Sequence, residues 1–92
     1  MTSEGVRIGF GMEQAMAVAT ELGIDFDVTP FTPEQFRRGM EVELEHGRRD
    51  PITDVTHDDP IITGKIAWAH LREMSDYYER LDAMEREAEG GR

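Results

Sequence analysis

The sequence predicts an all-α fold, a compact domain of four helices with a central antiparallel helical hairpin. Apolar residues recur at helical spacing in four segments, and each segment is flanked by start or stop signals typical of helices. Short β-branched runs such as 51–56 lie among Asp and Pro residues and do not predict a strand. With 92 residues, the chain is long enough for one small core and too short for two. We therefore expect a flexible N-terminal arm over 1–11, a single helical domain over 12–89 and a frayed tail over 90–92.

The first two predicted helices have clear boundary signals. The first covers 12–22 and stops at Gly23, because glycine readily adopts the left-handed conformation that ends a helix. The second starts after Thr32, where Thr at the N-cap and Gln35 three residues later predict a capping box. We expect this helix to end at Gly47, again on a glycine cap.

The last two predicted helices follow a polar connection that is long for a link between helices. Asp59 followed by Pro60 predicts an N-cap and the first helical position of a helix that extends to about Met74. Ser75 is the predicted N-cap of the fourth helix. The apolar stripe of that helix consists of Tyr77, Leu81, Met84 and Ala88.

The predicted core lies between the second and third helices and is closed by the fourth. On the third helix, Ile62, Ile66 and Ala69 form the stripe expected to face inward. Of the neighbouring rings Tyr77 and Tyr78, we expect one in the core and one at an interface, with Tyr77 on the apolar stripe. The predicted core residues are Phe36, Met40, Leu44, Ile62, Ile66, Trp68, Tyr77 and Leu81.

Charge and composition exclude several classes of protein. Ten Lys and Arg against twenty Asp and Glu give a net charge of −10, which argues against sequence-independent binding of phosphate backbones or anionic membranes. The chain has no Cys, so disulfides, thiolate metal sites and cysteine nucleophiles are excluded. No apolar run is long enough to predict a membrane span, and no secretory signal is visible, so we expect a cytoplasmic protein.

Two polar pairs interrupt the apolar stripes of the central helices. Glu43 lies beside the Phe36 stripe, and His46 is its neighbour three residues on. On the third helix, Glu73 lies in the middle of the predicted stripe and His70 flanks it. If the two helices pack antiparallel, all four side chains can meet near one end of the hairpin.

The four side chains allow three interpretations. They can ligate a divalent metal such as Zn, Mn or Fe, since inward-facing Glu-x-x-His pairs are what helical di-iron carboxylate proteins use. They can instead form a buried hydrogen-bonded network, with Tyr77 or Arg38 as a further partner, because buried charges need partners. They can also flank a solvated groove, only half buried.

These interpretations lead to three hypotheses for function. The first is a small acidic accessory domain, with no catalysis established, in which Glu43, His46, His70 and Glu73 either bind a divalent metal or stiffen the hairpin. The second is an acidic protein-interaction module that occupies a basic, nucleic-acid-binding surface of a partner protein. The third is a ferritin-like metal oxidoreductase, which needs a homodimer because one chain offers too few ligands.

The chain also resembles a known family in three blocks that occur in order. They are Glu43-Leu-Glu-His46, Ala69-His-Leu71 and Asp76-Tyr-Tyr78, within a similarity that covers roughly 32–86. The family is an uncharacterised helical domain family of bacteria, archaea and phages without an assigned function. The resemblance implies a small α domain and implies nothing about chemistry.

Overall fold

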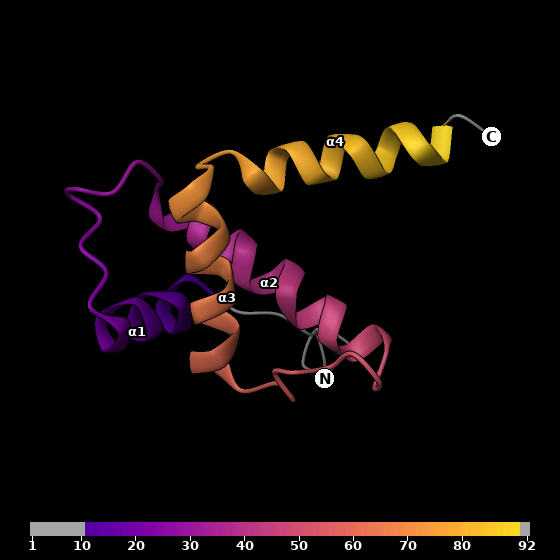
Figure 1. The fold of residues 1–92 in the computed structure, drawn as a ribbon. Helices are drawn as coiled ribbons and strands as arrows, with labels where there is room; N and C mark the ends of the chain where they lie inside the picture. The colour runs from indigo at the N-terminus through magenta and orange to yellow at the C-terminus, as the bar shows by residue number, and fades with distance from the viewer. Residues whose placement is uncertain (1–10, 91–92) are drawn as a thin grey trace, which may run out of the picture.

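The computed structural model describes residues 11–90, which form four α-helices and no strand. The helices are α1 (Met12–Leu22), α2 (Pro33–Arg49), α3 (Pro60–Glu73) and α4 (Tyr77–Gly90). In Figure 1, α2 and α3 cross at the centre in opposite senses, α1 lies to one side of them, and α4 extends away from the body. The predicted all-α class is therefore confirmed. The arm expected over 1–11 and the tail over 90–92 fall mainly on 1–10 and 91–92, outside the described residues.

The helix boundaries follow the capping signals of the sequence. Thr32 Oγ1 accepts a hydrogen bond from the Gln35 backbone N–H at 3.1 Å, and Gln35 Oε1 accepts one from the Thr32 N–H at 2.8 Å, which completes the predicted capping box. Asp59 Oδ1 accepts from two backbone N–H groups in the first turn of α3. Gly23 ends α1 at a φ of +83°, in the left-handed region that glycine adopts without strain.

Gly47 has a different role from the predicted one. It does not end α2, which continues to Arg49. Instead it is buried beneath the loop that joins α2 to α3, because a Cβ there would lie 2.6 Å from Asp54 Oδ1 and 2.9 Å from Thr56 Oγ1. The glycine therefore provides the space in which this loop packs onto α2.

The buried face of α3 is opposite to the predicted one. Thr63, Gly64, Ala67 and Leu71 are buried, whereas Ile62 is 40% exposed. Small residues decide this outcome, since a Cβ on Gly64 would lie 2.5 Å from Val18 Cγ1 of α1. The missing Cβ at Gly64 lets α3 pack closely against Val18 and Leu22 of α1 over this face. On α2, in contrast, the predicted core residues Phe36, Met40 and Leu44 are all buried.

The start of α4 reverses the expected order of the two tyrosines. Tyr78 is 2% exposed and is the only buried residue of α4, while Tyr77 and Leu81 are partly buried. The helix begins at Tyr77, so Ser75 lies in the preceding turn rather than at the N-cap. Trp68, predicted as core, is also only partly buried. Thus α4 is attached to the body mainly through its first turn, and it does not close the hairpin along its length. None of the helices in the described part of the chain has the length and apolarity that crossing a bilayer requires.

Candidate functional site

Glu43 is the carboxylate placed deepest between the helices at this site. It lies on the buried face of α2, between the buried residues Met40 and Gly47, and its side chain is 11% exposed. The Tyr78 hydroxyl of α4 donates a hydrogen bond to Glu43 Oε2 at 2.7 Å. A buried carboxylate needs such a donor, because removal from water without one is costly. This bond joins α2 to the first turn of α4.

The two histidines of the predicted set lie on either side of this carboxylate. His70 Nε2 of α3 is 3.6 Å from Glu43 Oε2, and His46 Nδ1 is 3.9 Å from Glu43 Oε1. Both rings are accessible to water, with His46 42% and His70 36% exposed. Each therefore comes close to Glu43 from the solvent side. We call Glu43, Tyr78, His70 and His46 the Glu43 cluster.

Glu73 does not join the Glu43 cluster. It is exposed, because α3 turns the face of Ile62 and Glu73 to solvent and buries the opposite one. Within residues 11–90, it forms no ion pair or hydrogen bond with the other three predicted residues. The structure thus brings together three of the four side chains that the spacing suggested.

Tyr78 is the member of the cluster that the sequence did not identify. Its ring lies against Gly39, where a Cβ would come within 2.6 Å of Tyr78 Cε2. Gly39 precedes Glu43 by four residues, so both lie on one face of α2. Gly39, one turn before the partly buried Glu43, was therefore the signal in the sequence for this contact. A glycine there leaves room for a large side chain that donates a hydrogen bond to the carboxylate.

The aromatic and ionic surroundings fix the protonation state of Tyr78. Burial, followed by the nearby negative charge of Glu43, raises the pKa of Tyr78 far above its ordinary value. The hydroxyl therefore keeps its proton and remains a donor. The Tyr77 ring stacks on His70 with centroids 4.2 Å apart and meets Tyr78 edge-on at 4.9 Å. These ring contacts hold α3 and the start of α4 together.

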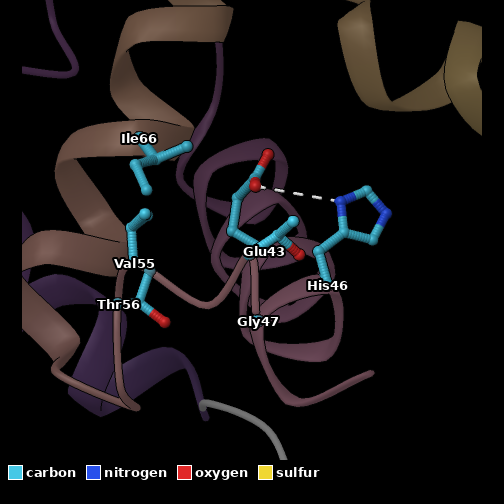
Figure 2. A pocket seen from close by; sticks show the side chains of 7 residues that line it. Glu43, His46, Gly47, Val55, Thr56 and Ile66 are labelled. Atoms are coloured by element: carbon cyan, nitrogen blue, oxygen red, sulfur yellow. Dashed lines mark ion pairs between the residues drawn. The ribbon is translucent and has the colours of Figure 1, made fainter. Parts of the chain in front are cut away.

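A small hollow of about 90 Å³ opens beside Glu43. Ile66 of α3 lies on one side of the Glu43 carboxylate and His46 lies on the other (Figure 2). Its other side is the loop between α2 and α3. Asp54 orders that loop by accepting hydrogen bonds from the His57 backbone N–H at 2.9 Å and from Thr56. These bonds lower the pKa of Asp54, and the one from the His57 N–H contributes most to that shift.

The chemistry available to the cluster is that of a charged, hydrogen-bonded link between helices. Among residues 11–90, no three His, Asp or Glu side chains are arranged to hold one metal ion. Glu43 Oε2 is already shared between the Tyr78 hydroxyl and the His70 ring. The structural interpretation of the cluster is therefore the better supported one, and metal binding stays a prediction.

Comparison with protein families gives a match over most of the chain. Residues 15–87 match the family described as Protein of unknown function (DUF5661). No curated protein and no solved structure matches the chain. The expected resemblance to an uncharacterised domain family is confirmed to that extent. Because the match spans most of the 92 residues, the chain belongs to the family Protein of unknown function (DUF5661).

Proposed function

We propose that this chain is an acidic protein-interaction domain that binds a basic partner protein through α4. The observation that carries the proposal is an apolar strip that begins in the turn before α4 and runs along one side of that helix, and that the body of the domain covers only in part. The strip consists of Met74, Tyr77, Leu81 and Met84, and we call it the α4 strip. Met74 is 43% and Met84 60% exposed. Contiguous apolar surface of this kind on a small protein is typical of a contact site.

Shape and charge support this proposal. Together with Arg80, the α4 strip lines a hollow of about 180 Å³ at the point where α4 leaves the body. The helix then continues past the core, as Figure 1 shows, so that a partner can reach it without displacing other elements. The net charge of −10 favours encounters with a basic protein surface.

The test is a photo-crosslinking experiment in the native cells. A photoreactive residue replaces Met84 on the strip or, as a control, Ile52, which is 91% exposed in the loop between α2 and α3. We expect a discrete adduct with another protein from position 84 only, and loss of that adduct at high salt. Adducts at both positions, or an adduct only with a second copy of this chain, would contradict the proposal.

Metal binding by the Glu43 cluster is a second and less supported proposal. Its basis is that His46 and His70 lie near different oxygens of one carboxylate, at 3.9 and 3.6 Å. A divalent ion there would compete with Tyr78 for Glu43. Elemental analysis and melting with and without chelator test it, and no bound metal with no chelator effect would refute it. A ferritin-like two-metal centre would in addition require iron-dependent dimerisation, which size-exclusion chromatography detects.

A further inference from the structure

The α4 strip has the geometry of a site for another helix. Tyr77, Leu81 and Met84 follow one another at intervals of four and three residues, so their side chains form one line along the helix axis. A binding element that covers such a line must run lengthwise along α4, as a helix does when it places residues of the same spacing against it. Methionine side chains at both ends of the strip suit this use, because they adapt to different apolar partners.

The charges along the strip differ between its two halves. In the first half, Arg80 is held by Asp76 at 2.8 Å, and Asp82 lies within 3.6 Å of Arg38 and 3.5 Å of Arg86. Apart from Glu79, whose carboxylate accepts a hydrogen bond from Gln35 Nε2 at 3.1 Å, these charges near the start of α4 are therefore neutralised from within the domain. A partner meets mainly apolar surface here.

In the second half, the charges are unbalanced. At about 100° per residue, Glu85 and Glu89 fall on one side of the line of the strip and Glu87 falls on the other. Within residues 11–90, none of these three carboxylates forms an ion pair or hydrogen bond with another side chain. They also lie at the end of α4 where the helix dipole is negative, which adds to their field.

Taken together, the strip and the carboxylates of Glu85, Glu87 and Glu89 indicate the occupant. We infer that α4 binds an amphipathic helix of a partner protein, whose apolar face covers the α4 strip and whose Lys or Arg residues flank that face opposite Glu85, Glu87 and Glu89. This inference rests on the proposed function and specifies its partner. Basic residues on both flanks complement the second half of α4, and apolar anchors complement the first half.

A second copy of the chain fits this surface less well. If two α4 helices paired in parallel, the free carboxylates of the two copies would face one another and repel. If they paired antiparallel, the carboxylates would meet Arg80, which Asp76 already neutralises. A separate basic helix has neither disadvantage.

The experiment titrates designed helical peptides of about 18 residues into the full chain by calorimetry at two salt concentrations. One peptide has an apolar stripe flanked by Lys, and the second carries Glu in place of every Lys. The test variant is Glu85→Lys/Glu87→Lys/Glu89→Lys. The matched control is Glu13→Lys/Glu21→Lys/Asp27→Lys, which changes the same number of exposed charges in α1 and the turn after it.

We expect the Lys peptide to bind, its affinity to fall at the higher salt concentration, and the Glu peptide not to bind. The α4 variant should weaken Lys-peptide binding about tenfold more than the control variant, since only the α4 carboxylates lie beside the site. Equal weakening by both variants, or equal affinity for the two peptides, would overturn the inference.

A Met74→Asp variant of the chain that carries the photoreactive residue at position 84 separates the inference from the proposed function, because Met74 lies on the same strip and is 43% exposed. If it abolishes the native crosslink while the α4 charge variant leaves it unchanged, the strip binds a partner but not a basic helix, and only the inference fails. If Met74→Asp changes neither the crosslink nor the binding of the Lys peptide, the proposed function fails as well.

Discussion

Tyr78 is the residue on which the burial of Glu43 depends. Its hydroxyl is the closest donor to that carboxylate, at 2.7 Å, whereas the two histidines stay 3.6 and 3.9 Å away. The histidines are also more exposed, so water screens their interaction with Glu43 more strongly. The hydrogen bond from Tyr78 is therefore the strongest interaction of the Glu43 cluster.

Replacing Tyr78 by Phe should lower the free energy of unfolding by about 2 kcal/mol, because a partly buried carboxylate loses a charge-assisted hydrogen bond. The measurement is urea denaturation followed by circular dichroism. Tyr77→Phe is the matched control, since it also removes one phenol hydroxyl but keeps the ring that stacks on His70. Equal losses in the two variants would show that the bond to Glu43 contributes nothing specific.

At the scale of single residues, the sequence correctly predicted that Glu43 lies at the helix interface and wrongly predicted the same of Glu73. The second helix has a single strong apolar stripe, so a charged residue beside it had to be partly buried. The third helix has two possible inward faces, one of Ile62, Ile66 and Ala69 and one of Gly64, Ala67 and Leu71. Hydrophobicity favours the first, but the close approach to α1 at Gly64 selects the second. Such steric selection depends on the neighbouring helix and is not readable from one segment.

At the scale of the helices, the sequence predicted where the helices begin and end better than it predicted which face of each helix is buried. Thr32, Asp59 and Gly23 act locally, through their own hydrogen bonds or backbone freedom, and the structure confirms all three. The prediction that Gly47 ends α2 was wrong. A small residue is needed there because the loop around Asp54 packs against it, and not because the helix ends. The sequence also did not predict that α4 extends away from the body, since the apolar stripe of α4 resembles that of a helix packed along its whole length.

Gly39 controls how closely α4 can pack on α2. A Gly39→Ala variant gains helix propensity, yet its Cβ would lie 2.6 Å from Tyr78 Cε2 and 3.1 Å from Ala67 Cβ. Because the Tyr78 ring is anchored at Glu43, we expect a net loss of about 1–3 kcal/mol from overpacking. Thermal unfolding measures the loss, and Gly90→Ala, at a glycine with open surroundings, is the control. A stabilised Gly39→Ala variant would contradict this packing.

The second half of α4 should be the least protected helical segment in the domain. Residues 83–90 are all exposed, and none of them belongs to the core or packs against it within the described part of the chain. Short helices without packing are marginal in water, and the carboxylates near this end oppose the helix dipole. Native-state hydrogen exchange should show near-complete exchange of these amides while those of residues 36–44 in α2 remain protected. Comparable protection in both segments would mean that α4 is held by contacts other than those described.

At the scale of the whole molecule, the domain combines a small core with a large negative charge. Self-repulsion of a chain with a charge of −10 opposes folding, and it grows as basic groups lose their protons at high pH. A general fall in stability is therefore expected in alkaline solution. Against this background, one specific contribution can be separated, because it comes from a single buried proton.

That proton belongs to Tyr78, whose pKa is raised in the folded state by burial and by Glu43. Below pH of about 10 the tyrosine is protonated in both states, so the proton gives no pH dependence. Above it, the unfolded chain releases the proton and the folded chain retains it, so stability falls by up to about 1.4 kcal/mol per pH unit. Tyr78→Phe lacks this group, and its unfolding free energy should fall less steeply between pH 10 and 11 than that of Tyr77→Phe. Parallel slopes for the two variants would show that the Tyr78 hydroxyl is not held protonated against Glu43, which would remove the central bond of the cluster.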